Sequence, residues 1–588
     1  MITTHRLSEE AFKALASGGG DVAVIQDLCA AQHSKQVMLL HAVDAAARET
    51  GPGSLEVAAF QAAYGLLATI QATDPGVVAW LLGLPHFSAW AHDCLLHLDR
   101  GEVPDFGYLV TAAVSAAVRS GAQFEIDVPA RDGQVLLPGL GRLSVPGRDP
   151  WLRVRGDGQQ LRAGALSDVP YAVLAPDDGS AEPVSYWRGT VLVRAMAEAQ
   201  TWNVLLETSD RYLDRYALPM SADLRAEEAA AWRRDIQSAW ELLVRHHGWA
   251  SGPVREGVSV IVPLVPRSDN DLDSATTPSA FGAIAASLPP SPVIMAEMLV
   301  HEFQHLKLCA LMDMVPLIEH RDEDERVYAA WRPDPRPAGG LLQGVYAHVG
   351  VAWFWNAQRR VETEPDGILR AQVMYERWRR TIEPSTSTLL QAGCLTEAGS
   401  LFLGMLRDHE RTLRPEPMPA EAMDIAGEVA LDHALTWQLR HTAIDAAGLA
   451  GLTAAYRRGA PLRMLPGTRI EADTRKADPA VRGRLLSMRY LDPARFRELC
   501  AAGVPGLSDA DALLIQGKPA EAAREYRETI VAATDAQPDA WIGLALAISR
   551  LAEAPAFTAR LPFLFDMHSQ LRDQGMDADP LDLAAWFA

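Results

Sequence analysis

The spacing of apolar positions predicts a mainly helical chain with one smaller β-rich portion. Over residues 8–98 apolar residues recur at helical spacing. Ser8 is a good N-cap for the first helix, which the glycines at 18–20 end. Further amphipathic segments follow at residues 37–48 and 55–70. The first 103 residues are therefore expected to form a helical region.

The pattern changes near residue 104. Residues 123–128 and 151–155 alternate polar and apolar side chains, which is the period of a half-buried strand, and Gly and Pro punctuate the sequence between them. A β-rich insertion over residues 104–192 is the prediction. Beyond it, a helical pattern covers 222–246, and strands are expected at 258–264 and 281–288.

Helices dominate the rest of the predicted structure. One begins at Ser291-Pro292, with proline at the favoured first position, and ends near Pro316. Residues 508–554 resemble a single tetratricopeptide-like hairpin, which favours a packing role because a lone repeat makes no extended concave surface. We expect a catalytic core at 193–415, a helical region at 416–588, and an α+β fold that is mainly α.

The composition limits which binding partners and which cellular compartment are expected. The 588 residues carry a formal net charge of −21, which disfavours nucleic acid and suits a neutral or cationic peptide. The first ten residues lack the apolar stretch of a signal peptide, and no uncharged run is long enough to span a bilayer. Five separated cysteines contain no Cys-x-x-Cys pair. A cytoplasmic protein with reduced thiols and no membrane partner is expected.

The candidate chemistry lies in His301-Glu302-Phe303-Gln304-His305. Helical residues four apart share a face, so His301 and His305 can hold one divalent metal ion. The surrounding helix is otherwise apolar, and polar side chains buried there need partners. A metal ion supplies one. A pair of hydrogen-bonded core histidines is the alternative.

A metal site needs at least a third protein ligand. Leucines at positions 308 and 311 exclude the metzincin extension of the motif. We favour His348, which lies in an apolar helical run, and this predicts a metal site between two buried helices. The alternatives lie in a charge-rich segment nearer the motif: Glu319, His320, Glu323, Asp324 and Glu325.

A stiff, proline-rich loop at residues 331–337 carries two arginines beside Trp331. A guanidinium is the usual partner of a carboxylate, so Arg332 or Arg336 is a candidate for binding the carboxylate of a substrate or cosubstrate. The alternative is a surface turn in which these arginines pair with Asp334.

Two chemistries suit the motif. In a zinc peptidase, Glu302 would be the catalytic general base that takes a proton from metal-bound water. In an iron enzyme, the two histidines and a third ligand would form a facial triad, and Glu302 would have a supporting role. The spacing of the residues does not separate these possibilities.

Several segments together resemble the HEXXH-motif family found beside ribosomally made peptide natural products. The segments are 279–283, 296–308, 331–337 and 344–348, and residues 7–18 and the hairpin at Gly517 look similar too. The resemblance spans most of the chain and is far more specific than the five-residue motif.

The resemblance implies iron(II)- and 2-oxoglutarate-dependent β-hydroxylation of a residue in a ribosomally synthesised precursor peptide. In that case His301, His305 and His348 would bind iron, and Arg332 or Arg336 would bind the distal carboxylate of 2-oxoglutarate. A zinc peptidase using Glu302 and a non-catalytic peptide-binding scaffold are the alternatives. The sequence predicts neither the target residue nor the oligomeric state.

Overall fold

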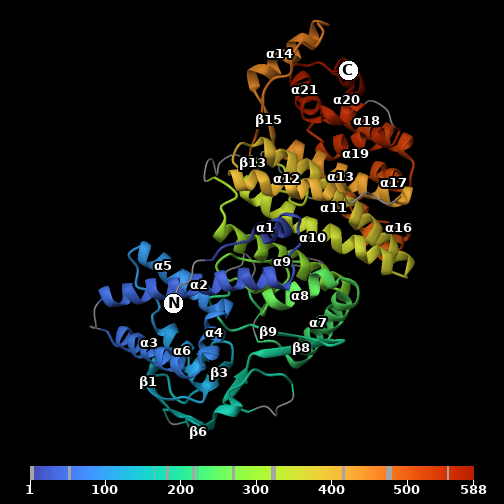
Figure 1. Cartoon of the computed structure of the whole chain (residues 1–588). Coiled ribbons are helices and arrows are strands. Elements are labelled where there is room, and N and C mark those ends of the chain that lie inside the picture. The colour runs from blue at the N-terminus through green and yellow to red at the C-terminus, as the bar shows by residue number, and fades with distance from the viewer. Residues whose placement is uncertain are drawn as a thin grey trace. The chain divides into compact units, whose positions relative to one another are not determined.

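The chain folds into two compact units, Met1–Pro316 and Leu317–Ala588, in a computed structural model (Figure 1). The structure describes residues 5–50, 54–164, 166–179, 184–214, 219–221, 223–267, 272–319, 326–412, 417–471, 480–551 and 555–587. The described chain is mainly helical with several small sheets, as predicted. The predicted core at 193–415 has residues in both units.

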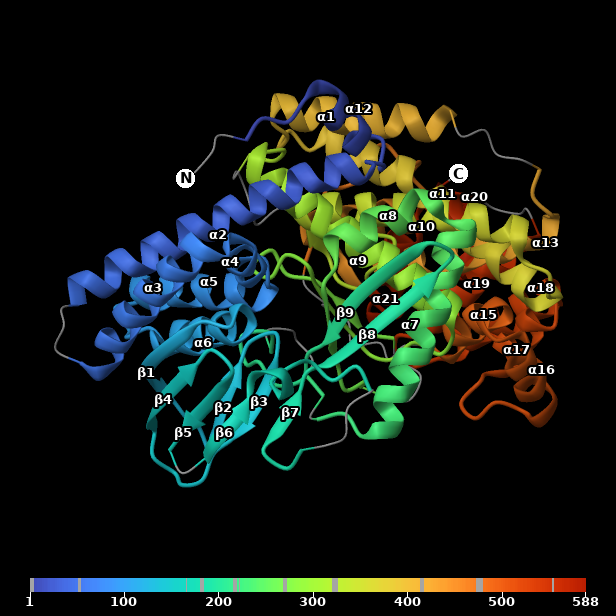
Figure 2. The same ribbon diagram turned by 60° about the horizontal axis from the view of Figure 1, so that its bottom comes forward.

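Six helices begin the first unit. Ser8, Ser54 and Asp74 each accept a hydrogen bond from the backbone N–H three residues later, which caps the helix that follows. Helix α3 packs on α6 (Figures 1 and 2). The helices are α1 (Glu9–Ala16), α2 (Val22–Thr50), α3 (Leu55–Thr73), α4 (Pro75–Leu82), α5 (Pro85–Asp99) and α6 (Gly107–Ser120).

Helix α6 lies inside residues 104–192, where the sequence suggested only a β-rich insertion. All its residues from Gly107 to Val118 are buried. A helix that is buried on every side has no polar face, so its sequence carries no amphipathic period to reveal it.

Two small antiparallel sheets follow α6. One has the order β1-β4-β5-β6 and the other β2-β3-β7. The strands predicted at 123–128 and 151–155 are confirmed as β1 and β4, which pair from Gln123↔Asp157 to Pro129↔Trp151. The strands are β1 (Gln123–Pro129), β2 (Gln134–Leu137), β3 (Gly141–Ser144), β4 (Trp151–Asp157), β5 (Gln160–Ala163), β6 (Leu166–Pro170) and β7 (Trp187–Gly189).

A mixed five-stranded sheet supports the motif helix. Its order is β11-β12-β10-β9-β8; β9, β10 and β12 run parallel, and the edge strands β8 and β11 run antiparallel to their neighbours. The predicted strands at 258–264 and 281–288 correspond to the shorter β10 and β12, whose residues are all buried. The strands are β8 (Val191–Ala197), β9 (Gln200–Leu206), β10 (Val260–Pro263), β11 (Ser274–Ala275) and β12 (Ala283–Ala286).

Three helices pack with this sheet. Helix α7 (Ala226–His246) contacts β8, and both α7 and α8 (Gly248–Gly257) contact α9 (Pro292–Met314), the motif helix. Figure 2 shows α7 beside the β8–β9 hairpin. The sequence predicted α9 closely. Ser291 caps its first turn by accepting a bond from the Ile294 N–H, and Pro292 is its first residue.

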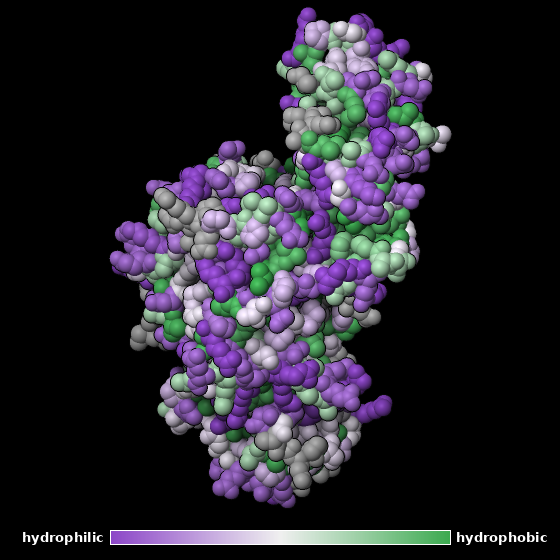
Figure 3. Space-filling view, turned by 90° about the vertical axis from the view of Figure 1, so that its right-hand side faces the viewer, coloured by the Kyte–Doolittle hydropathy of each residue, from purple (hydrophilic) through white to green (hydrophobic). Residues whose placement is uncertain are grey.

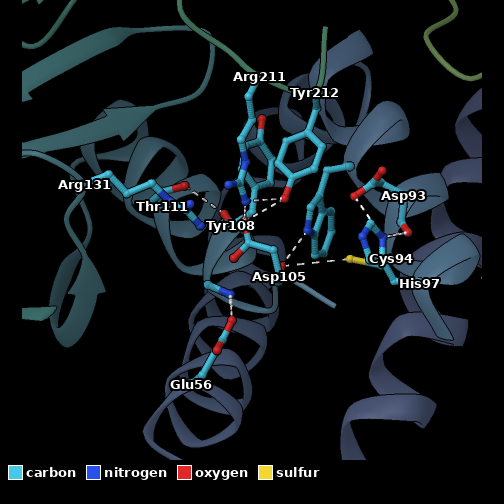
Figure 4. A network of polar contacts seen from close by, with 12 residues as sticks. Glu56, Asp93, Cys94, His97, Asp105, Tyr108, Thr111, Arg131, Arg211 and Tyr212 are labelled. Atoms are coloured by element: carbon cyan, nitrogen blue, oxygen red, sulfur yellow. Dashed lines mark hydrogen bonds and ion pairs between the residues drawn. The ribbon is translucent and has the colours of Figure 1, made fainter. Parts of the chain in front are cut away.

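A polar network joins the N-terminal helices to the segment after β9 (Figure 4). At its centre is Asp105, whose carboxylate pairs with Arg211 and accepts a hydrogen bond from the Tyr212 hydroxyl at 2.7 Å. The Trp90 indole donates to the Asp105 carbonyl at 2.8 Å, and the Tyr108 hydroxyl donates to the neighbouring Asp210. These contacts fix α5 and α6 against the sheet.

The described residues of the second unit form helices and two short antiparallel strand pairs. Strand β13 (Arg326–Val327) pairs with β14 (Arg336–Pro337), and β15 (Thr442–Ile444) pairs with β16 (Thr468–Ile470). The helices of this unit are α10 (Ala338–Val361), α11 (Pro365–Gln391), α12 (Glu397–Thr412), α13 (Ala420–His441), α14 (Ala446–Arg457), α15 (Val481–Leu491), α16 (Pro493–Ala502), α17 (Asp509–Ile515), α18 (Pro519–Ala532), α19 (Pro538–Arg550), α20 (Pro555–Ala559), α21 (Leu561–Asp573) and α22 (Pro580–Phe587).

The region of the predicted C-terminal hairpin contains α18 and α19, which pack on each other. A fully buried guanidinium attaches it to the rest of the unit. Arg482 bonds to Asp432 at 3.0 Å and to Asp511 at 2.9 Å, and the Tyr526 hydroxyl of α18 donates to the same Asp511. The hairpin is therefore held to α13 and α15 by charge as well as by apolar packing.

The surface mixes polar and apolar residues. Figure 3 shows hydrophilic and hydrophobic side chains interspersed over the face in view. Among the residues that the structure describes, no helix has both the length and the apolar character needed to cross a membrane.

Candidate metal centre

The histidine pair lies on the open side of a mostly buried helix. Between residues 295 and 311 of α9, every residue is buried except Glu297, His301, His305 and Cys309, which recur every fourth position. The stripe faces away from the apolar contacts that hold the helix. Both imidazoles therefore belong to the less buried stripe of this stretch of α9.

The two imidazoles converge. Nε2 of His301 lies 3.2 Å from Nε2 of His305, and the His301 side chain keeps 25% of its surface exposed. Two nitrogens bound to one ion at about 2.0–2.1 Å are roughly 2.9–3.4 Å apart in tetrahedral or octahedral geometry. The pair thus fits a metal ion. A hydrogen bond between two imidazoles has a similar length, so the core-pair alternative also fits this distance.

Glu302 places a carboxylate beside the pair. Its Oε1 accepts a hydrogen bond from the Ser274 hydroxyl at 2.7 Å and lies 3.9 Å from Nε2 of His301. Its Oε2 is buried without a hydrogen-bond partner among the described residues. Burial raises the pKa of Glu302, against the opposing effects of His305, Ser274 and Thr276. Ser274 and Thr276 both act on this carboxylate, and a metal ion or a water bound to it would be a further partner for Oε2.

A neighbouring, buried face of α9 is anchored to the N-terminal segment. The Lys307 ammonium donates to the carbonyls of Gly18 at 2.9 Å and Gly19 at 2.6 Å, and the Gln304 carboxamide donates to Gly18 at 3.0 Å. Burial lowers the pKa of Lys307 to about 7. These bonds fix the rotation of α9, and with it the direction in which His301 and His305 point.

His348 lies in the second unit, in the middle of α10. Its ring stacks on Trp331 at a centroid distance of 4.6 Å and packs against Trp378 at 4.3 Å. Its Nδ1 lies 2.8 Å from the Gly344 carbonyl. If Nδ1 carries the proton and donates it there, Nε2 is left with the lone pair that a metal takes. This is the tautomer that a ligand needs.

The two arginines of the 331–337 loop pair with the aspartate between them. Arg332 donates to Asp334 at 2.9 Å and Arg336 donates to it at 3.2 Å. Both guanidinium groups are substantially exposed. The alternative suggested for this loop, an Arg–Asp surface turn, is therefore present, and binding of a cosubstrate carboxylate stays a prediction.

The structure brings His301, Glu302 and His305 together in the first unit, whereas His348 and both arginines belong to the second. Within the described residues of either unit, no group of three or more His, Cys, Asp or Glu side chains could hold a metal ion. The third ligand is therefore still a prediction. The alternative Glu319 belongs to the second unit, and the others lie outside the described residues: His320, Glu323, Asp324 and Glu325.

Sequence reasoning missed the partners of these residues. Ser274 and Thr276, which surround Glu302, are ordinary loop-forming residues that carry no signal of their role. Trp378 packs on His348 from a helix thirty residues further along the chain, at a position with no motif.

Comparison with known proteins adds no family. Protein-family models gave no match to this sequence, and the curated proteins contain no similar sequence either.

Proposed function

We propose that the protein is an iron(II)- and 2-oxoglutarate-dependent β-hydroxylase of a ribosomally synthesised precursor peptide. The observation that carries the proposal is the convergence of two partly exposed imidazoles, His301 and His305, on an otherwise buried helix. The resemblance of the surrounding segments favours iron over zinc. Iron with 2-oxoglutarate would supply the oxidising power that a C–H bond requires.

The proposed third ligand is His348. Its Nδ1 contact with the Gly344 carbonyl favours the tautomer in which Nε2 carries the lone pair, and its two tryptophan neighbours hold the ring in one orientation. Arg332 directly follows the stacked Trp331, so the loop that would bind the distal carboxylate of 2-oxoglutarate adjoins His348. Binding would require the arginine to exchange Asp334 for the cosubstrate.

Glu302 has a supporting role in this proposal. It is held by Ser274 beside His301, where its negative charge favours a cation at the histidine pair. It does not need to move a proton during hydroxylation.

The first test uses the full-length protein under anaerobic conditions. Iron(II) with 2-oxoglutarate should give a weak visible charge-transfer band, and turnover in air should release succinate and add one oxygen atom to the peptide. We expect His301→Ala and His348→Ala to lose the band. His246→Ala, at an exposed histidine at the end of α7, is the matched control. Full activity of His348→Ala would remove that residue from the site.

A zinc peptidase is the second candidate, because of one observation. The Glu302 carboxylate is close enough to the histidine pair to act on a metal-bound water, and burial raises its pKa toward the range of a general base. If zinc alone supports turnover, 2-oxoglutarate has no effect and the peptide is cut into two fragments, the hydroxylase proposal is wrong.

A further inference from the structure

The strand next to the histidine pair is an edge strand. β11 is the last strand of the five-stranded sheet, and its inner side pairs with β12 through Ser274↔Ala286 and Ala275↔Ala285. Ser274 is exposed. Edge strands offer unpaired backbone groups to any extended chain that reaches them.

The direction of these backbone groups follows from the register. The Ser287 N–H donates to the Asp273 carbonyl at 2.8 Å, so the backbone groups of Asp273 point toward β12. In an antiparallel pair the direction alternates from residue to residue, and those of Ser274 therefore point outward. Among the described residues, no backbone hydrogen bond is made to the outer side of Ser274.

The same residue connects the edge to the candidate metal centre. The Ser274 hydroxyl donates to Glu302 Oε1, the oxygen that lies 3.9 Å from Nε2 of His301. Its side chain is thus on the α9 face of the sheet. Side chains of a strand alternate between the two faces, so every second residue of a chain added at this edge would project to that same face.

We propose that an extended segment of the peptide substrate binds by adding a strand to the outer edge of β11, with alternate side chains facing His301 and His305. Backbone hydrogen bonds would supply the affinity and the neighbouring surface the selectivity. Leu272, which precedes β11, and Leu288, which follows β12, are 55% and 38% exposed and offer apolar contacts. The proposal rests on the proposed function only in taking the bound peptide to be a substrate.

The test uses a peptide selected from a random library for binding to the metal-free, full-length protein. Each backbone N–H of that peptide is then methylated in turn. In β-pairing only alternate N–H groups point to the partner strand. We expect methylation at every second position to weaken the Kd by roughly tenfold and methylation at the others to change it little. A loss without alternation, or no selectable peptide, overturns the proposal.

Two substitutions of one residue test the protein side. Ser274→Pro removes the outward N–H and the hydroxyl, whereas Ser274→Ala removes only the hydroxyl. The inner ladder with β12 does not use the Ser274 N–H, so the proline is expected to fold. We expect the Kd of the selected peptide to be roughly tenfold weaker for Ser274→Pro than for Ser274→Ala. If the proline variant does not fold, hydrogen exchange of the Ser274 N–H in the natural chain decides: binding of the selected peptide should protect it, and an unprotected N–H overturns the proposal.

The two proposals fail differently. Alternating methylation effects without release of succinate would leave the edge as a peptide-binding surface and end the hydroxylase proposal. Succinate release with a peptide whose methylation shows no alternation would leave the hydroxylase proposal intact and exclude strand addition at β11.

Discussion

Gly344→Ala tests the packing around the proposed third ligand. A Cβ at this position would lie 2.2 Å from Cζ2 of Trp331 and 2.3 Å from both Cε2 and Nε1 of the same ring. The ring cannot simply move away, because its other contact is the His348 imidazole, which is itself packed against Trp378. Only glycine allows the indole to lie this close to α10.

Two opposite effects decide whether Gly344→Ala raises or lowers the free energy of unfolding. Replacing a glycine inside a helix by alanine normally stabilises by about 0.5–1 kcal/mol. Overpacking a well-filled region costs about 1–3 kcal/mol. Three ring atoms are overlapped here and the ring is confined, so the upper part of that range applies. We expect a net loss of about 2 kcal/mol, which lowers the Tm of the unit by roughly 4–8 °C.

The matched control is Gly404→Ala in α12 of the same unit, where a Cβ would meet nothing within 4 Å. It should be unchanged or more stable by up to about 1 kcal/mol. Thermal unfolding followed by circular dichroism gives both values. If Gly344→Ala is as stable as Gly404→Ala, Trp331 does not pack on α10 as described and does not hold the His348 ring.

Three further predictions concern buried charges. Glu302→Gln should weaken iron binding by about 10–100-fold, whereas kcat at saturating iron should stay within several-fold of the unsubstituted protein. Metal titration measures the first value and succinate release the second. A fall in kcat of about 10²–10⁴-fold would instead indicate that Glu302 is a general base. Lys307 keeps its proton in the unfolded chain up to a pKa near 10.5 but releases it near 7 when folded, so stability should rise from pH 7 to pH 9. Denaturant unfolding of Lys307→Met should lack that rise, and an unchanged slope would refute the assignment. Arg482→Met leaves Asp432 and Asp511 buried without their cation and should cost about 3–5 kcal/mol; denaturant unfolding showing a loss under about 1 kcal/mol would contradict this.

Local signals predicted the motif helix well. Ser291 and Pro292 mark its start, and the four-residue spacing of His301 and His305 places both on one face. These features depend only on neighbours in the sequence. Helix α6 escaped prediction because burial on all sides erases the period that reveals a helix.

The contacts that complete the candidate site depend on tertiary structure. Ser274 reaches Glu302 from a strand in the middle of a loop-like segment, and Trp378 reaches His348 from another helix. The two residues of each pair have no characteristic spacing and form no known motif, so the contact cannot be predicted from one sequence. The sequence was enough to predict the imidazoles as candidate ligands. The residues that contact the Glu302 carboxylate and His348 could be identified only from the folded structure.

The bonds between Lys307 and the Gly18–Gly19 carbonyls have a consequence for how the protein is handled. A chain shortened to begin after Gly20 would keep every proposed ligand. It would also leave an ammonium and the Gln304 carboxamide on a buried face of α9 without the acceptors that now receive them. The N-terminal segment, although it contributes no metal ligand, is therefore part of the motif helix's support.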